Sequence, residues 1–492
     1  MTADVMETGA AALWDTLEAR VAAGERFAGL FATARQEEDT LVLSAHVARE
    51  GGIGTLEAML APGAGSYPAL TPRLGAAFWY EREIHDHFGV VPQGHPRLAP
   101  LVLHGSPEDH ALPRHVAGYG MFTIPHGPVR SGVTESIEYL VETPGEAIPH
   151  LNMRVFYKHR GIERRFEGMT VADGVLLAER TEGIASVAHA LAYCHAAEQI
   201  AGCVPPRAAG LVRVLHAELE RIANHLDVAG KLANAGGLAV AEARFALHKE
   251  RVLRLVSGLC GSRFGRGVVV PGGVSALPRQ RPAEILSALG RLEKAITADA
   301  DALMDTASFL DRLRGTGRLD PGRARDHGAL GPIGKASAFS DDGRFTRPYD
   351  AYPSLGLPAG RAHDSGDALA RLDVRWDEVA QSFLLLRQAV AELAELADAG
   401  GPQAALRAAC GPPGGAGGAE GVSGRAVGWA EAPQGEVLYD VTLEDGRITR
   451  CRPRSASFHN LVLMHEVFAG DILTDFPFIE ASFGLSVAGV AL

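Results

Sequence analysis

Residues 179–192 read ERTEGIASVAHALA, and the rest of the chain is organised around this stretch. From residue 185 it becomes rich in alanine and leucine, which favours a helix that reaches residue 201. A basic turn, KHRGIER, precedes it at residues 158–164. The stretch therefore sets charged side chains, Arg180 and Glu182 among them, directly before a long helix.

The composition is that of an ordinary globular protein. Of the 492 residues, 47% are hydrophobic and 22% are charged, and the length suffices for several domains. The net charge of -12 and the lack of a dense basic stripe argue against nucleic acid as a partner. No apolar run approaches the ~20 residues of a membrane span, and the acidic N-terminus lacks the features of a signal peptide. We therefore expect a cytoplasmic protein that contacts a membrane through a partner.

The five cysteines do not form a visible metal-binding motif. Iron–sulfur clusters and soft metals need several thiolates at fixed spacing, and no C-x-x-C pair occurs here. We expect small buried side chains rather than disulfides at these positions. The cysteines are Cys194, Cys203, Cys260, Cys410 and Cys451.

The residue order in the opening stretch resembles the Arg-x-Cys-Gly-x-Cys-x-x-x-His motif of [NiFe] hydrogenase large subunits. These subunits share a superfamily with the quinone-pocket subunit of respiratory complex I. Arg180, Gly183 and His189 stand at the matching positions. Glu182 and Ala185 replace the two cysteines. The resemblance implies the frame of a metal site without this half of its ligands.

The end of the chain corresponds to the hydrogenase segment that carries the other two cysteines. Residues 475–492 read DFPFIEASFGLSVAGVAL, where hydrogenases carry Asp-Pro-Cys-x-x-Cys. Ser486 and Gly489 hold the two cysteine positions. The resemblance thus implies that all four thiolates are absent, and nickel and iron need such soft ligands. We predict that this chain binds no metal ion.

A long signature near the N-terminus resembles the small peripheral-arm subunit of complex I. Residues 79–96 read WYEREIHDHFGVVPQGHP, against Trp-x-Glu-Arg-Glu-x-x-Asp-x-Phe-Gly followed by Gly-His-Pro. The resemblance implies an α/β domain, which we place at residues 1–115. The charged residues crowded between 81 and 87 are interpreted as a docking face rather than a catalytic site. The elements expected in this domain are helices at 13–31 and 72–88 and a strand at 40–46.

Residues 116–492 are predicted to form a mainly helical domain with β-hairpins, similar to hydrogenase large subunits. With the N-terminal domain this makes an α+β protein. A hairpin with an Asp-Gly turn is expected at 435–450, and the Gly-containing residues 328–352 are interpreted as loop. The helices expected are 185–201, 209–229, 245–259, 282–313 and 367–396.

A turn at residues 121–133 corresponds to the element that contacts the quinone headgroup in complex I. That element reads Gly-Pro-x-His-Pro-x-x-His, whereas Arg130 and Thr134 hold the histidine positions here. His126 lies one residue before the Gly-Pro pair. The resemblance implies that His126, Arg130 and Ser131 are the candidates for binding a quinone.

Two further groups of charged residues are singled out by spacing. Arg160 and Glu163 belong to a His-Arg-Gly-x-Glu element of the superfamily. Three residues apart, they are expected to pair on one helix face, as a structural clamp or as part of a proton path. Glu218, Arg221 and His225 flank an apolar helical stripe and are interpreted as a salt-bridged core rather than metal ligands.

We expect four distant segments to meet at one buried space. They are residues 126–132, 160–163, 180–189 and 475–486. An ionised carboxylate in a dry space needs a cation or several donors. Glu182 is therefore predicted to pair with Arg130, Arg160 or Arg180. The candidate residues are Arg130, Arg160, Glu163, Arg180, Glu182, His189, Asp475 and Ser486.

The resemblance covers about residues 70–492 and implies a fusion of two catalytic-arm subunits of a complex I-like or hydrogenase-like oxidoreductase. Its cavity would receive a quinone or another small acceptor, reduced from a [4Fe–4S] cluster in a partner iron–sulfur small subunit. Ion-translocating membrane subunits would be further partners, with this chain peripheral on the cytoplasmic side of the inner membrane. One alternative is a non-enzymatic coupling or scaffold subunit with a closed cavity. Another is an active [NiFe] hydrogenase, against which the missing ligands argue.

Overall fold

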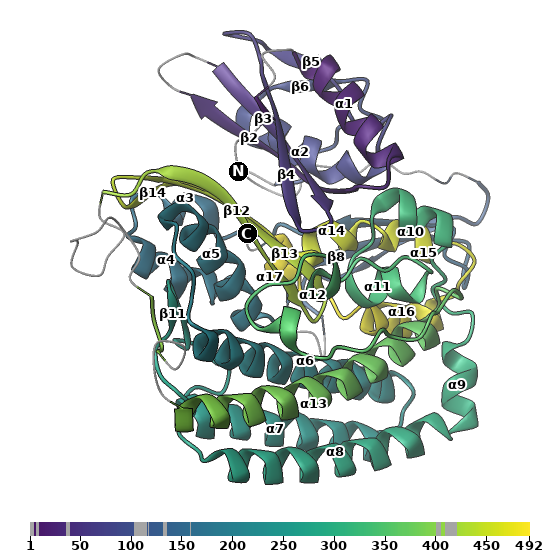
Figure 1. The fold of residues 1–492 in the computed structure, drawn as a ribbon. Helices are drawn as coiled ribbons and strands as arrows, with labels where there is room; N and C mark the ends of the chain where they lie inside the picture. The colour runs from purple at the N-terminus through teal and green to yellow at the C-terminus, as the bar shows by residue number, and fades with distance from the viewer. Residues whose placement is uncertain are drawn as a thin grey trace.

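The protein has an upper β-rich part that rests on a larger, mainly helical part (Figure 1). The fold is mixed α+β, as the sequence predicts. The computed structural model describes residues 4–5, 9–35, 40–102, 116, 118–130, 135–157, 159–399, 405–408 and 421–492.

A four-stranded sheet in the order β1-β4-β3-β2 forms the upper part. Neighbouring strands are antiparallel except for the parallel pair β1–β4. Helix α1 (Ala10–Ala22) covers one face and buries Leu13, Trp14 and Leu17 against it. The strands are β1 (Asp4–Val5), β2 (Arg26–Arg35), β3 (Thr40–Arg49) and β4 (Gly52–Met59).

The helix predicted at residues 13–31 is too long. Helix α1 ends at Ala22, and strand β2 begins at Arg26. Gly24 has a φ of 100°, a conformation that stops a helix and that glycine adopts without strain. The apolar residues after it lie in a strand whose two faces are both covered, which a helical pattern mimics. The strand predicted at 40–46 is confirmed within β3.

The helix predicted at residues 72–88 is confirmed as a 3₁₀ turn, η1 (Gly75–Ala77), followed by α2 (Phe78–Phe88). Its charged side chains hold nearby loops. Glu81 accepts from the backbone N–H of Leu70, Arg82 donates to the carbonyl of Ala99, and Asp86 accepts from the N–H of Leu101. Strands β5 (Ser66–Pro68) and β6 (Val91–Gln93) pair beside this helix.

The predicted hairpin after residue 116 is confirmed as part of a three-stranded antiparallel sheet. Gly127, with a φ of 110°, closes its turn, and a Cβ there would lie 2.0 Å from the carbonyl oxygen of Ile137. Only glycine allows this approach. Ser131 and Thr134 lie outside the described residues. The strands are β7 (Phe122–His126), β8 (Glu138–Thr143) and β9 (His150–Arg154).

Four long helices form the lower layers (Figure 1). The helix predicted at residues 209–229 lies within α6. Its predicted apolar stripe is buried, through Leu215, Leu219, Ile222 and Leu226. The helix predicted at 282–313 is divided into α8 and α9 (Ala307–Leu313). The four helices are α6 (Arg207–Ala235), α7 (Ala239–Cys260), α8 (Pro282–Met304) and α13 (Ala368–Ala399).

Shorter elements connect these layers. The loop predicted at residues 328–352 is only partly confirmed, because two short helices lie within it. Aspartate and proline there start turns of helix that a glycine-rich composition conceals. The connecting elements are α3 (Ile162–Phe166), α4 (Val171–Ala178), α5 (Ser186–Ala201), β10 (Val269–Val270), β11 (Gly273–Val274), α10 (Pro321–His327), α11 (Gly331–Ala336), α12 (Gly343–Thr346) and η3 (Tyr352–Ser354).

A second three-stranded antiparallel sheet lies between the two parts, and α5 packs on it. The predicted Asp-Gly turn joins its last two strands at Asp445 and Gly446. The remaining elements are β12 (Gly424–Ala432), β13 (Gly435–Glu444), β14 (Arg447–Arg454), α14 (Ala456–Leu461), α15 (Met464–Val467), η5 (Leu473–Asp475), α16 (Phe476–Phe483) and α17 (Val487–Val490).

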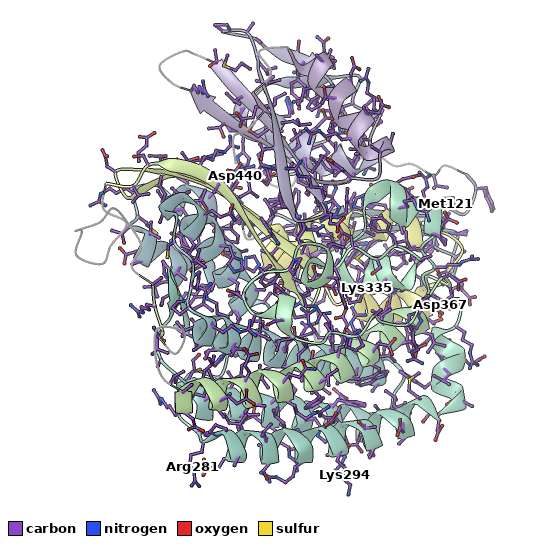
Figure 2. The ribbon with its side chains drawn as sticks, viewed as in Figure 1. Met121, Arg281, Lys294, Lys335, Asp367 and Asp440 are labelled. Carbon is purple, nitrogen blue, oxygen red and sulfur yellow. The ribbon has the colours of Figure 1, made fainter. Side chains whose placement is uncertain are left out.

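Buried ion pairs join the upper part to this sheet. Glu436 of β13 binds Arg26 of β2 at 2.7 Å and Arg454 of β14 at 2.7 Å. Asp440, which lies where the two parts meet (Figure 2), binds His46 of β3 at 3.2 Å. One hydrophobic cluster also runs from α1 through α2 to α17. The two parts therefore share a core.

The expectation of five small buried thiols without disulfides is only partly met. Cys194 and Cys451 are buried free thiols, and Cys260 is half-buried. Cys203 is disulfide-bonded, so the expectation is wrong there. Spacing along the chain does not reveal a pair that the fold brings together. Cys410 lies outside the described residues.

Candidate functional site

The candidate site centres on the carboxyl group of Glu182. Its Oε2 lies 3.0 Å from Nε2 of His189, and the hydroxyl of Ser457 donates to its Oε1 at 2.7 Å. The three residues are at most 1% exposed. Glu182 precedes α5, His189 lies on α5, and Ser457 lies on α14. Three separate segments therefore close around one carboxyl group.

Strand β13 holds the histidine from its other side. The hydroxyl oxygen of Tyr439 lies 2.9 Å from Nδ1 of His189 and 3.2 Å from Oγ1 of Thr181. Burial raises the pKa of Tyr439 well above its ordinary value, so this phenol keeps its proton at physiological pH. The imidazole is thus fixed between a carboxyl group and a phenol.

The C-terminal segment completes the site. A Cβ at Gly489 would lie 2.6 Å from the carboxyl carbon of Glu182, so the glutamate fills the space beside residue 489. The N–H of Ser486 donates to the hydroxyl of Ser457 at 3.1 Å, and its own hydroxyl donates to Glu135 at 2.5 Å. Hydrogen-bonded oxygens of Glu182 and Ser486 thus lie at two of the positions where the resemblance implies thiolates.

Arg160 links the same segments through their backbone. Its Nη2 donates to the carbonyl oxygens of Thr181 at 2.6 Å and Ala488 at 2.5 Å. Its Nη1 donates to the carbonyl of Arg180 at 3.3 Å. Burial lowers the pKa of Arg160, while the nearby charge of Glu182 raises it. Arg160 therefore fastens the C-terminal segment to the residues before α5.

The predicted pair between Arg160 and Glu163 does not form. Gly161 caps α3 in a left-handed conformation, so Arg160 lies outside the helix and the two side chains share no helical face. Glu163 instead forms an ion pair with Arg452 of β14. The expected clamp between these two residues is therefore wrong, because each of them binds a different segment.

The prediction that Glu182 pairs with an arginine is wrong. Each of the three arginines already has another acceptor in the part of the chain that the structure describes. Arg180 is half exposed and pairs with Glu179 at 2.6 Å. His189 and Ser457 supply the hydrogen bonds to the carboxyl group instead.

A second polar group surrounds Arg130. Its guanidinium binds Glu480 of α16 through two nitrogens, at 2.6 Å and 3.1 Å, and lies over the ring of Tyr139 at 5.1 Å. The ring of His126 lies 5.4 Å from that of Phe476. Burial and then the charge of Arg130 lower the pKa of His126, so the imidazole is neutral at pH 7. The turn is thereby attached to the C-terminal segment.

Asp475 lies apart from both groups. It forms an ion pair with Arg312 of α9 at 3.0 Å, near the start of α16. Glu135 lies between the two groups instead, since its charge acts on both Arg160 and Tyr139. The structure thus brings Arg160, Glu182, His189 and Ser486 to one polar group and Arg130 to the other. The side chains of Glu163, Arg180 and Asp475 bind elsewhere.

A buried cluster of charges lies beneath α5. Glu218 binds Arg221 at 3.3 Å and Arg344 at 3.3 Å, and His225 lies 2.7 Å from Glu378. The interpretation of this helix as a salt-bridged core is therefore confirmed. Further members of the cluster are Lys335 (Figure 2), Asp342, Tyr352, Ser382 and Glu431.

Sequence reasoning missed several site residues, among them Ser457, Glu135, Glu480, Tyr139 and Tyr439. Glu480 had a usable signal, because it is the one acid in the otherwise apolar helix α16. Ser457 and Glu135 had none, since a serine or a glutamate in an ordinary segment carries no spacing pattern. Only the fold brings them to the site.

Two negative findings apply to the described residues. No group of three or more His, Cys, Asp or Glu side chains is arranged to hold a metal ion there. No helix among them is long and apolar enough to cross a membrane.

The chain matches two family models in sequence order. Residues 12–118 match the respiratory-chain NADH dehydrogenase 30 Kd subunit. Residues 237–410 match the respiratory-chain NADH dehydrogenase 49 Kd subunit.

The relatives with assigned names include subunits of hydrogenase complexes and of NADH-quinone oxidoreductases. The chain is 27% identical to formate hydrogenlyase subunit 5 of Escherichia coli, over 85% of this chain and 75% of that protein. It is 30% identical to an NADH-quinone oxidoreductase subunit of Deinococcus radiodurans, over 54% of this chain and 67% of that one. A chain of the archaeal membrane-bound sulfane sulfur reductase has the same fold, with a TM-score of 0.69 and 22% identity, over 77% of this chain and all of that one.

The chain belongs to the superfamily of complex I and hydrogenase subunits. Within it, this chain joins the 30 Kd and 49 Kd regions in one polypeptide.

Proposed function

We propose that the chain is a catalytic-arm subunit of a membrane-associated oxidoreductase that works without a [NiFe] centre. The observation that carries this proposal is the packing of Glu182 against residue 489, with His189 and Ser457 bonded to its two oxygens. Hydrogenase-like electron chemistry at this position would need four thiolates in place of these groups. The reaction must then take place at another group of residues beside the same site.

The group around Arg130 fits the binding of a small electron acceptor. Its guanidinium and an N–H of the His126 imidazole can donate hydrogen bonds to a carbonyl oxygen, and Tyr139 and Phe476 offer aromatic faces. A quinone headgroup has both features. Ser131 remains a further candidate for this contact. The electrons would come from a [4Fe–4S] cluster in a partner iron–sulfur small subunit.

We infer the partners and the location from the names of the relatives. Proteins named as subunits of formate hydrogenlyase, membrane-bound hydrogenase and NADH-quinone oxidoreductase support an assembly with an iron–sulfur subunit and ion-translocating membrane subunits. This chain would lie at the cytoplasmic side of the inner membrane as a peripheral subunit. We also propose that it divides into an arm-like domain at residues 1–115 and a large-subunit-like domain at 116–492.

One observation favours a second candidate function. Glu182, His189 and Ser457 are all buried, and His189 and Ser457 each bond to Glu182, so side chains would fill the superfamily's metal position. A subunit closed in this way could couple or support its partners without turnover. In the first candidate function Arg130 binds the electron acceptor, whereas in the second it has only a structural role.

The test is acceptor reduction by the native complex isolated with Arg130→Gln. If Arg130 binds the acceptor, the variant raises KM for a short-chain quinone by about tenfold or more, which corresponds to one lost charge-assisted hydrogen bond. Arg312→Gln is the matched control, because Arg312 also pairs with an acid near α16 and stacks on an aromatic ring. A complex that assembles but reduces no acceptor, with or without the substitution, would favour the scaffold role.

A further inference from the structure

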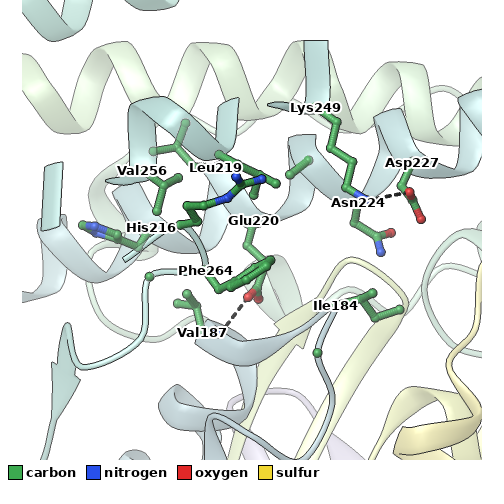
Figure 3. A pocket seen from close by; sticks show the side chains of 15 residues that line it. Ile184, Val187, His216, Leu219, Glu220, Asn224, Asp227, Lys249, Val256 and Phe264 are labelled. Carbon is green, nitrogen blue, oxygen red and sulfur yellow. Dashed lines mark hydrogen bonds and ion pairs between the residues drawn. The ribbon is translucent and has the colours of Figure 1, made fainter. Parts of the chain in front are cut away.

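A small cavity lies on the other side of the residues that precede α5. Its volume is about 80 Å³, which is room for a few water molecules. The first turn of α5, helices α6 and α7 and the loop before β10 enclose it (Figure 3). Its apolar wall consists of Ile184, Val187, Leu219, Leu253, Val256 and Phe264.

One carboxyl group lies in this apolar wall. Glu220 of α6 points toward α5 and accepts from the backbone N–H of Val187 at 2.7 Å and of Ala188 at 3.1 Å (Figure 3). The residue at the helix start, Ala185, offers no side-chain cap of its own. Glu220 therefore supplies the hydrogen bonds that the first N–H groups of α5 need.

Glu220 is partly exposed and, unlike Glu218 and Asp227 on the same helix, has no cation at bonding distance within the described residues. Burial raises the pKa of Glu220 to about 8, and its two backbone hydrogen bonds offset this only in part. Both charge states are therefore populated near neutral pH. The charged or titratable groups that face it or line the cavity are Glu182, His216, Arg221, Asp227, Lys249 and Arg263.

The charge state of this carboxyl group decides how well α5 is held. An ionised carboxylate accepts both N–H bonds, whereas a protonated one turns one oxygen into a donor and weakens the cap. His189 lies on the first turn of α5, and Glu182 immediately precedes that turn. The charge of Glu182 also acts on Glu220 across the turn. Protonation at the cavity is thus linked to the geometry of the candidate site.

We propose that Glu220 is a proton-exchanging positioning residue, which takes protons from water in the cavity and sets the placement of Glu182 and His189. The inference rests on the proposed function for its effect on turnover. Reduction of a quinone by two electrons consumes two protons, so a residue that responds to protons beside the site would make turnover depend on pH. Glu220 itself does not contact the acceptor.

The test compares Glu220→Gln with wild type in the native complex, over pH 6 to 9. Glutamine keeps one acceptor oxygen but cannot titrate. We expect the wild-type pH profile of acceptor reduction to change near pH 8 and the variant profile to lose this limb. A merely structural role would lower turnover by the same factor at every pH.

The matched control is Glu81→Gln. Glu81 is also a buried carboxyl group that accepts from two backbone N–H groups, and its pKa is also raised by burial. It lies in the upper part, away from the cavity. This variant should keep the wild-type pH profile, and a profile changed in the same way by both variants would overturn the proposal.

A second readout does not need turnover. Hydrogen exchange of peptides that cover residues 183–190, corrected for the intrinsic pH dependence, should slow severalfold as wild type is taken from pH 7 to pH 9. The Glu220→Gln variant should show no such change. A complex that reduces no acceptor but shows this exchange behaviour would contradict the proposed function and leave the role of Glu220 standing. The same pH dependence of exchange in both proteins would contradict the role of Glu220.

Discussion

Two buried carboxyl groups near β13 are held in opposite ways. Burial pulls the pKa of Glu436 upward, but Arg26, Arg347 and Arg454 outweigh it and hold that pKa well below the usual range. Glu182 lies among a histidine, a serine and a glycine, with no arginine bonded to it in the described residues.

The difference in partners indicates that the two carboxyl groups have different roles. A carboxylate with three guanidinium partners stays ionised and fixes the orientation of the segments that carry them. A carboxyl group with neutral or titratable partners can change its bonding with little electrostatic cost. We conclude that Glu436 holds the two parts together, whereas the partners of Glu182 allow its bonding to change.

The largest effect is expected for Glu436→Gln. Removal of this charge leaves three buried guanidinium groups without their shared partner, which costs about 3–5 kcal/mol of unfolding free energy. Denaturant unfolding checks this, with the exposed Glu444→Gln on the same strand as control. A loss no larger than that of the control would remove the contrast with Glu182.

A smaller effect is expected for Glu182→Gln. The amide keeps the contact with Ser457 but can place an NH2 group where an oxygen faces His189, so the expected loss is about 1–3 kcal/mol. In the native complex the same variant should lower acceptor reduction, because His189 loses its fixed partner. Unfolding and turnover should be measured together, and a loss of stability as large as that of Glu436→Gln would mean that both groups are structural.

At pH 5 the smallest effect is expected for Glu431→Gln, and this effect depends on pH. Burial and the charge of Asp342 raise the pKa of Glu431 to about 8, against about 4.3 in an unfolded chain. The folded protein therefore binds a proton that the unfolded chain releases. This contribution is complete below about pH 4 and is lost as pH rises to 8, by at most about 1.4 kcal/mol per pH unit.

Glutamine at position 431 cannot titrate. The variant should therefore gain stability relative to wild type as pH rises from 5 to 8, and the gap at pH 5 should be small. Unfolding curves at several pH values test this. A constant gap across that range would show that Glu431 is ionised in the folded protein, as Glu436 is.

The sequence predicted the fold where a pattern repeats along the chain. The apolar stripe of α6 and the Asp-Gly turn after β13 are local signals, and both are confirmed. The helix predicted at 13–31 failed because a buried strand and a helix have the same apolar content over a short run. Gly24 was the signal that marked its end.

The candidate site was harder to predict because its partners come from distant segments. Arg160 and Glu163 lay close in sequence, yet Gly161 separates them and each finds a partner elsewhere. Glu182 was placed in the site by its motif, but its partner Ser457 lies 275 positions further along the chain. Motifs identify which residues reach a site, whereas the pairing of charges follows from packing.

The most direct test of the central claim is the nickel content of the native complex. We proposed that Glu182 fills the superfamily's metal position, and this predicts far less than one nickel ion per copy of this chain. Glu182→Cys should not change this, since one thiolate does not replace four. Elemental analysis of the purified complex measures it, and one nickel ion per copy in the wild-type protein would contradict the account.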